Sequence, residues 1–110
     1  MRVKFIILGC GYSLGVPSAD GSWGKCNRKE KRNYRTRCSA LIKSNFKNIL
    51  IDTSPDLRTQ LIKNNITNID NVIFSHNHAD QIHGINDLRI FSYKNKKRIT
   101  AYADKETEKY

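Results

Sequence analysis

Apolar residues in the first half of the chain come in short runs separated by polar turns, a pattern that predicts β-strands. Residues 3–8 read as a buried first strand, residues 38–42 as a second and residues 49–52 as a third. The polar residues 44–48 connect the second and third runs, which predicts a hairpin. The N-terminal half is therefore expected to begin a β-sheet.

A helix is predicted directly after the third strand. In Ser54-Pro55-Asp56 the serine caps, the proline fits the first turn and the aspartate favours the positive end of the helix dipole. Leu57, Leu61 and Ile62 then form one apolar stripe, and the helix is expected to end near residues 64–65.

The second half of the chain contains a further strand at residues 69–74, which ends abruptly at Ser75. The later segments read as a short helix or turn at 84–91, a basic loop at 93–98, a final strand at 99–103 and a new helix capped by Asp104. Six residues after a cap are too few for a stable helix. The expectation is therefore a truncated or split gene product.

The length of 110 residues, 38% of them hydrophobic, suffices for one small domain, 1–110, and is too short for two. Residues 17–37 are polar and glycine-rich and predict a long loop. Seven basic residues lie between Lys25 and Arg37 beside a single acid, Glu30, and the whole chain carries a formal charge of +10. This charge fits either a polyanionic partner or a general coding bias towards lysine. Because only Tyr34 interleaves with the basic cluster, a nucleic-acid partner is not favoured.

Three cysteines without a CxxC pair disfavour a disulfide framework and favour the reducing cytoplasm. The apolar core at residues 5–8 is shorter than the roughly 7–15 residues of a secretory signal. No stretch approaches the ~18 apolar residues of a membrane span. A cytoplasmic protein without a membrane partner is expected.

All three histidines and an aspartate lie within eight residues after the strand that ends at Ser75. Imidazole nitrogens and carboxylate oxygens bind zinc, manganese or iron. In an extended loop, His76, His78 and Asp80 would point to the same side because side-chain direction repeats every two residues. The pattern predicts a metal site, and the alternative is a polar loop at a strand end.

The run Ser-His-Asn-His-Ala-Asp-Gln at residues 75–81 resembles the His-x-His-x-Asp-His signature of the metallo-β-lactamase superfamily. The resemblance implies that His76 and His78 hold one metal ion and that Asp80 helps to hold a second. Gln81 departs from the signature, and a neutral amide replaces imidazole poorly at zinc. At most one ion is therefore expected, although an intact relative would hold one or two. His83 is a candidate for a metal ligand or for a residue that contacts the ligands without binding the metal.

Three further blocks resemble the PhnP-like phosphodiesterase branch of this superfamily, namely residues 8–17, 37–41 and 51–58. The resemblance implies an α/β (α+β) fold, the metallo-β-lactamase αββα sandwich, in which two sheets pack face to face with helices outside. The chain would form only its N-terminal half, a mixed β-sheet with flanking helices. A further histidine, a metal-bridging aspartate and a final histidine of the family would lie beyond Tyr110.

The resemblance implies a metal-dependent hydrolase of a small phosphodiester, with zinc as the cofactor and manganese as the alternative. Asp80 would then be catalytic as well as a ligand. Asp52, at the end of a strand near the metal loop, is expected to accept a hydrogen bond that orients a ligand histidine; the alternative is that it stabilises the turn before the helix. Arg35 and Arg37 could bind a substrate phosphate, or their loop is simply solvated.

Whether this chain is itself an enzyme stays open among three hypotheses. The first is a fragment with little activity alone. The second is half of a hydrolase completed by a C-terminal partner chain or by self-association. The third is a basic nucleic-acid-binding protein without catalysis.

Overall fold

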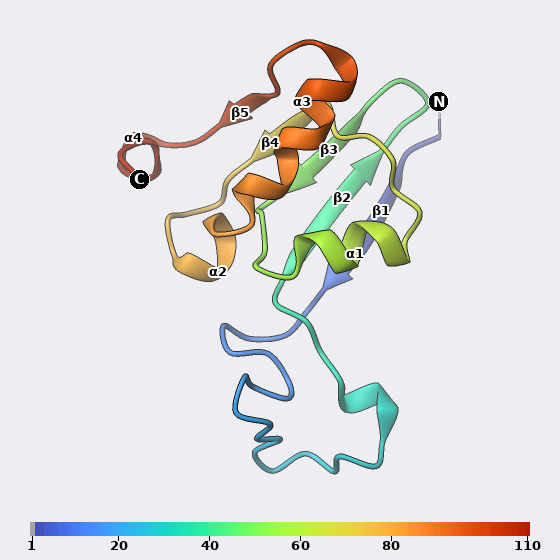
Figure 1. Cartoon of the computed structure of the whole chain (residues 1–110), viewed down its shortest axis with the longest axis vertical. Helices are drawn as coiled ribbons and strands as arrows, with labels where there is room; N and C mark the ends of the chain where they lie inside the picture. The colour runs from blue at the N-terminus through green and yellow to red at the C-terminus, as the bar shows by residue number, and fades with distance from the viewer. Residues whose placement is uncertain (1) are drawn as a thin grey trace.

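The computed structural model describes residues 2–110 and contains a five-stranded mixed sheet in the order β1-β2-β3-β4-β5 (Figure 1). The strands are β1 (Lys4–Gly9), β2 (Ser39–Lys43), β3 (Asn48–Ile51), β4 (Asn71–Ile73) and β5 (Thr100–Tyr102). The pairs β1·β2 and β2·β3 are antiparallel, whereas β3·β4 and β4·β5 are parallel. The C-terminal ends of β1, β3, β4 and β5 therefore meet at one edge of the sheet, where ligands commonly bind in sheets with parallel strands. The predicted mixed sheet and hairpin are confirmed.

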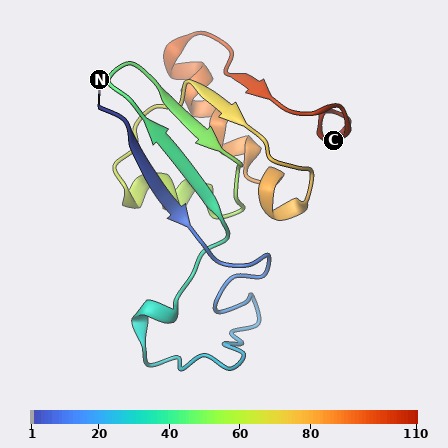
Figure 2. The same ribbon diagram turned by 180° about the vertical axis from the view of Figure 1, so that it is seen from behind.

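The helices are α1 (Leu57–Lys63), α2 (Ala79–Ile82), α3 (Arg89–Asn95) and α4 (Lys105–Glu108), with 3-10 turns η1 (Lys31–Asn33) and η2 (Ile85–Leu88). Of these helices, α1 and α3 lie over one face of the sheet, and the view from behind shows the other face without a covering helix (Figure 2). Within residues 2–110, none of these helices has the length and apolar character needed to cross a bilayer.

The core lies between the sheet and the helices α1 and α3. Leu41, Leu50 and Val72 occupy paired positions on β2, β3 and β4, and all three are fully buried. Leu57 from α1 and Phe91 from α3 belong to the same buried cluster. Because side chains alternate between the two faces of a strand, Leu41, Leu50 and Val72 all face the helices.

The opposite face of the sheet, which we call the open face, is apolar and has no covering layer in residues 2–110. Strand pairing places Ile7, Ile51, Ile73 and Tyr102 in one row across the sheet, because directly paired residues share a face. The apolar side chains that the strands place on the open face are Phe5, Ile7, Ala40, Ile42, Ile49, Ile51, Ile73 and Tyr102. Ile7 is 65% exposed, so the prediction of a buried first strand is wrong for one of its two faces.

The predicted helix after β3 is confirmed, but it begins at Leu57 with Asp56 in the N-cap position, so Ser54 is not its capping residue. Its inward face also differs from the prediction. Ile62 is 63% exposed and Gln60 is buried in its place. The Gln60 amide nitrogen donates to the carbonyl oxygen of Arg37 at 2.7 Å and to Thr36 Oγ1 at 2.9 Å. Its amide oxygen accepts from the Ser54 hydroxyl at 3.0 Å. These bonds satisfy a buried amide, so a polar residue takes the position that hydrophobic patterning assigned to isoleucine.

The basic segment after η2 also differs from the prediction. Residues 93–95 continue α3 to Asn95, where a loop was expected from Tyr93 onward. Lys96 then ends the helix in the left-handed conformation at φ 53°. The final strand and the helix capped by Asp104 are confirmed, since Asp104 Oδ1 accepts from the Thr107 N–H at 2.8 Å.

Residues 17–37 run without a strand or an α-helix, apart from the 3-10 turn η1, and project away from the sheet (Figure 1). The base of this loop is tied to the segment after β1 by backbone bonds, among them Gly11 N to the Thr36 oxygen at 2.7 Å. The Arg32 guanidinium beside Glu30 holds the pKa of that carboxyl below its usual range. The loop thus leaves the same sheet edge at which β3 and β4 end.

Candidate metal centre

The segment that carries the histidines leaves the sheet where β4 ends. The Phe74 N–H donates to the Tyr102 oxygen at 2.8 Å and makes the last bond to β5. Ser75, His76 and Asn77 follow without regular structure, at the edge that β3 also reaches with Asp52. The fold therefore brings together residues that are 23 positions apart in the sequence.

His76 and His78 face each other, as the two-residue repeat predicted. His76 Nε2 lies 3.1 Å from His78 Nδ1, and the ring centroids are 4.5 Å apart at an interplanar angle of 76°. Two nitrogens that bind one tetrahedral zinc ion at 2.0–2.1 Å would lie roughly 3.4 Å apart. The two converging nitrogens therefore fit two of the donors of one metal ion.

Asp52 is linked to the first histidine of this pair by hydrogen bonds through Ser75. Its Oδ1 accepts from the Ser75 N–H at 2.7 Å and its Oδ2 from the Ser75 hydroxyl at 2.6 Å, and the same hydroxyl lies 2.8 Å from His76 Nδ1. Asp52 is buried and adopts φ 61°, a left-handed conformation that is uncommon outside glycine. The turn before α1 is held instead by Ser54 Oγ, which accepts from the Asp56 N–H at 2.9 Å. Asp52 thus contacts the histidine segment through Ser75, and its role towards the ligands stays a prediction.

Asp80 does not continue the alternation of the histidines, because α2 begins at Ala79. Its Oδ2 accepts from Gln81 Nε2 at 3.0 Å. Gln81 is buried, and its amide also donates to Cys38 Sγ at 3.3 Å while its Oε1 has no hydrogen-bond partner. The geometrical expectation for Asp80 is therefore wrong, whereas its role as a ligand stays a prediction.

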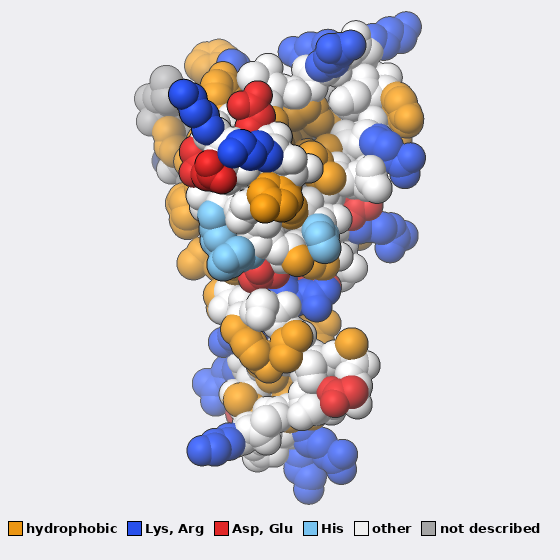
Figure 3. Space-filling view, turned by 90° about the vertical axis from the view of Figure 1, so that its left-hand side faces the viewer, with side chains coloured by type: hydrophobic (Ala, Val, Ile, Leu, Met, Phe, Trp, Pro, Cys, Tyr) orange, Lys and Arg blue, Asp and Glu red, His pale blue; other side chains and the backbone are white. Residues whose placement is uncertain are grey.

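The position of α2 is fixed by the segment after β3. The Gln81 carbonyl oxygen accepts from Thr53 N at 2.7 Å and from Thr53 Oγ1 at 3.1 Å, and Gly84 N donates to the Thr53 oxygen at 3.0 Å. His83 ends α2 and is exposed. Figure 3 shows two imidazoles side by side and the third apart from them. The structure therefore brings together two of the three histidines.

Within residues 2–110, no group of three or more histidine, cysteine, aspartate or glutamate side chains is arranged to hold a metal ion. A catalytic zinc site normally has three protein ligands and one open position. The fit to a metal is therefore partial: the described residues bring two imidazole donors together, and a third donor is not in place.

The two arginines proposed for substrate phosphate differ in their surroundings. Arg37 is half-buried and forms an ion pair with Asp56, with Nε 2.8 Å from Oδ2 and Nη2 3.2 Å from Oδ1. Arg35 is exposed, and its Nη1 lies 3.4 Å from the Tyr34 oxygen. Of the two, only Arg35 presents its guanidinium to solvent without a carboxylate partner.

Ser75 is a residue of the candidate site that the sequence did not single out. Its hydroxyl links Asp52 to His76, although its only role in the sequence was to mark the end of a strand. The available signal was its place directly before the first histidine, together with an aspartate at the end of another predicted strand.

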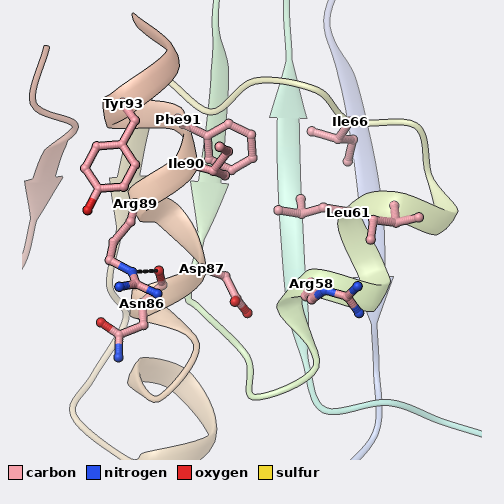
Figure 4. A pocket seen from close by; sticks show the side chains of 10 residues that line it. Arg58, Leu61, Ile66, Asn86, Asp87, Arg89, Ile90, Phe91 and Tyr93 are labelled. Carbon is pink, nitrogen blue, oxygen red and sulfur yellow. Dashed lines mark hydrogen bonds between the residues drawn. The ribbon is translucent and has the colours of Figure 1, made fainter. Parts of the chain in front are cut away.

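A groove of about 550 Å³ between α1 and α3 lies apart from the predicted site residues (Figure 4). Its lining is mainly apolar, with Leu61, Ile66 and Phe91 among the residues, and Arg58, Asp87 and Arg89 add charge. None of the residues proposed for metal or phosphate lines it. The candidate centre is consequently the histidine pair at the sheet edge.

Comparison with known proteins supports the family resemblance. Residues 47–110 match the model of the β-lactamase superfamily domain. The chain is also similar to the crystal structure of a diphosphatase from the PhnP family, with 35% identity and a TM-score of 0.89. It covers 44% of that protein, and 99% of the present chain is aligned. The chain thus spans less than half of this relative.

Two further relatives show how far the likeness extends. Zinc-bound PqqB from Methylobacterium extorquens is 22% identical with a TM-score of 0.74, over 96% of this chain and 38% of that one, which shows a shared fold. An octanoyltransferase of Porphyromonas gingivalis is 36% identical over 103 residues, 93% of this chain but 20% of that protein. Four-fifths of that protein therefore lies outside the match. By the domain match and the likeness to the PhnP-family structure, the chain belongs to the metallo-β-lactamase superfamily of hydrolases and is PhnP-like.

Proposed function

We propose that this chain supplies the N-terminal half of a metal-dependent phosphodiesterase. The observation that carries the proposal is the convergence of His76 Nε2 and His78 Nδ1 at 3.1 Å, on a loop held by buried Asp52. The likeness to a PhnP-family diphosphatase supports a small phosphodiester or diphosphate as the substrate class. The phosphoryl group would approach the sheet edge, and the exposed guanidinium of Arg35 is the proposed phosphate contact.

Zinc is the proposed ion and manganese the alternative, since the chain shares its fold with a zinc-bound protein. When bound, such an ion lowers the pKa of a water ligand and polarises a phosphoryl oxygen. His76 and His78 would hold the ion. Asp80 would be a further ligand once its carboxylate is brought to the pair: the Gln81 amide donates to its Oδ2 at 3.0 Å, and its other oxygen has lone pairs for a metal ion.

Gln81 supports a stoichiometry of at most one ion per chain. Its Nε2 donates to Asp80 and Cys38, so the side chain occupies the space beside the aspartate as a hydrogen-bond donor. The amide nitrogen that faces Asp80 cannot coordinate a cation, and the neutral amide oxygen replaces imidazole poorly at zinc. A single ion held by two histidines of this chain also implies little activity until further ligands are provided.

The test of metal binding is native mass spectrometry of the purified chain with added zinc, alongside circular dichroism. The expected result is one zinc ion per folded chain, lost in His76→Ala and in His78→Ala. His83→Ala is the matched control, because it removes an exposed histidine that does not belong to the pair. Zinc binding that survives both single substitutions, or that is lost only in His83→Ala, refutes the proposed centre.

The open face supports a partner that carries the second half of the fold. Its row from Ile7 to Tyr102 runs across all five strands, and an apolar surface of this kind is typical of an interface. The PhnP-family diphosphatase has more than half of its length outside the region that matches this chain. We propose that a C-terminal partner polypeptide covers the open face and completes the metal site.

This partner proposal can be tested with the part of the PhnP-family diphosphatase that this chain does not cover as a probe. The expected result is a one-to-one complex with phosphodiesterase activity on bis(p-nitrophenyl) phosphate. Ile7→Lys should abolish the complex, because burying one isoleucine contributes about 1.5–3 kcal/mol and a buried lysine charge adds a further penalty. Ile62→Lys is the control, since Ile62 is 63% exposed on α1 whereas Ile7 is 65% exposed on the open face. A complex that tolerates Ile7→Lys, or a stable dimer of this chain that excludes the probe, contradicts the proposal.

The basic loop favours a second candidate function, the binding of nucleic acid without catalysis. Lys25, Arg28, Lys29 and Lys31 are exposed on the projecting loop, and Tyr34 is 54% exposed beside them. Such a surface would bind phosphates with an affinity that falls steeply with salt. RNA binding that depends on salt and is unchanged by zinc would support this candidate. The free thiols Cys10, Cys26 and Cys38 support a cytoplasmic location for either function.

A further inference from the structure

We infer that Ser75 and Asp52 together fix the tautomer of His76, so that Nε2 always presents its lone pair to the metal position. This inference rests on the proposed function, because it concerns the same histidine pair. Ser75 is a positioning residue in this scheme: it acts on His76 and touches no reacting atom. The tautomer follows from which atoms donate and which accept along the contacts from Asp52 to Ser75 and from Ser75 to His76.

The first link is between Asp52 and Ser75. An ionised carboxylate can only accept hydrogen bonds, and a serine hydroxyl has a single hydrogen to donate. The distance of 2.6 Å between Ser75 Oγ and Asp52 Oδ2 is typical of a hydroxyl that donates to a charged oxygen. Asp52 Oδ1 accepts the Ser75 backbone N–H at 2.7 Å, which fixes the carboxylate in its plane. The hydrogen of the Ser75 hydroxyl is therefore used on Asp52.

The second link follows from the first. Ser75 Oγ has only lone pairs left for His76 Nδ1, which lies 2.8 Å away. His76 Nδ1 must consequently carry the proton and donate it. A neutral imidazole carries one N–H, so His76 Nε2 is left as the acceptor. It is Nε2 that points towards His78.

The third link concerns His78 in the metal-free chain. His78 Nδ1, 3.1 Å from His76 Nε2, must carry a proton to make that hydrogen bond. A metal ion that takes both nitrogens removes this bond, and a neutral His78 then carries its proton on Nε2. The tautomer of His76 is thus the same before and after metal binding, whereas the tautomer of His78 changes.

Three substitutions separate this role from a general effect on folding. Ser75→Ala removes the hydroxyl, and Ser75→Thr restores one at the same position. Asp52→Asn keeps the shape but reverses one bond: the oxygen of the new amide would still accept the Ser75 N–H, so the amide nitrogen would donate to Ser75 Oγ. The Ser75 hydroxyl would then donate to His76 Nδ1, and the proton of His76 would move to Nε2.

The experiment is long-range ¹H–¹⁵N imidazole NMR on the ¹⁵N-labelled 110-residue chain without metal, with zinc titration on the same samples. The wild-type chain and Ser75→Thr are expected to show His76 protonated at Nδ1, Ser75→Ala a mixture of tautomers, and Asp52→Asn protonation at Nε2. Zinc affinity should fall by about 10–100-fold in Ser75→Ala and Asp52→Asn, the usual cost of losing a residue that orients a metal ligand. Circular dichroism confirms that each variant is folded, and Ser75→Thr against wild type carries the test where another variant does not fold.

Protonation of His76 at Nε2 in the wild-type chain overturns the inference, and so does an unchanged tautomer in Asp52→Asn. The NMR result is independent of the proposed function. A chain that shows the expected tautomers but binds no zinc would refute the metal centre and leave the positioning role of Ser75 intact. If every variant bound zinc with equal affinity and kept His76 protonated at Nδ1, the positioning role of Ser75 would be refuted and the metal centre would stand.

Discussion

Replacing Gly84 with alanine is expected to destabilise the chain, although the backbone of Gly84 has an ordinary φ of −83°. The cost is steric: a Cβ at this position would clash with the carbonyl oxygen of Ser54 and would lie 2.8 Å from the Ser54 carbonyl carbon. Both partners are backbone atoms of a fully buried segment, since Thr53 and Ser54 have no exposed surface. Relief therefore requires α2 to move away from residues 53–54.

The size of the effect follows from the bonds that this movement breaks. Three hydrogen bonds join α2 and Gly84 to Thr53, from Thr53 N and Oγ1 to the Gln81 oxygen and from Gly84 N to the Thr53 oxygen. At about 1 kcal/mol net for each bond, their loss costs about 3 kcal/mol, which also matches the usual cost of overpacking a buried site, about 1–3 kcal/mol. We expect Gly84→Ala to lower the free energy of unfolding by about 2–4 kcal/mol.

The assay is urea unfolding followed by circular dichroism, with the midpoint and the slope compared between variants. Gly21→Ala is the control, because a Cβ there would meet nothing within 4 Å and its only penalty is the left-handed φ of 84°. That penalty is about 1 kcal/mol. A Gly84→Ala chain as stable as Gly21→Ala would refute the contact between α2 and residues 53–54.

Three further predictions concern the core, a helix cap and the metal count. Leu50→Ala should cost about 2–5 kcal/mol in urea unfolding because Leu50 has no exposed surface, whereas Phe46→Ala, at an 81% exposed position, should change stability by less than about 0.5 kcal/mol. The backbone N–H of Thr107 lowers the pKa of Asp104 below its ordinary value of 3.8, so the cap contributes fully above that value and is lost as the pH falls through the lowered pKa. The stability difference between wild type and Asp104→Ala should therefore be constant at neutral pH and shrink below pH 3.8, and a constant difference down to about pH 2 would contradict it. Gln81→His should raise the zinc count of the partner-completed protein in native mass spectrometry, and an unchanged count would argue against the assignment of Gln81.

Local sequence signals predicted most of the elements because each carries its own physical cause. The apolar runs gave β2 and β3, and Asp104 caps α4 with the bond expected of an aspartate before a first turn. His76 and His78 face each other because the loop between β4 and α2 is extended, which a two-residue repeat captures. These features depend on neighbours in sequence and could be predicted from it.

The features that sequence analysis missed depend on partners far along the chain. Gln60 is buried because Arg37 and Thr36, 23 and 24 residues earlier, accept its amide hydrogens. Ser75 gained its role from Asp52, 23 residues earlier. The exposure of Ile7 depends on which face of β1 the helices α1 and α3 cover. Patterning alone cannot supply such pairings, because it records the polarity of a residue and not the identity of its partner.

The candidate centre has two supports that come from different parts of the fold. The histidine pair depends on the ends of β3 and β4, through Asp52 and Ser75. Asp80 depends on α2, which Thr53 and Gly84 hold in place. The two halves of one short signature should therefore respond separately: Gly84→Ala should disturb the Asp80–Gln81 contact and spare the tautomer of His76, whereas Ser75→Ala should do the opposite. If both substitutions changed the His76 imidazole signals equally, the consecutive residues of the signature would have to move as one unit, and the separate supports described above would be wrong.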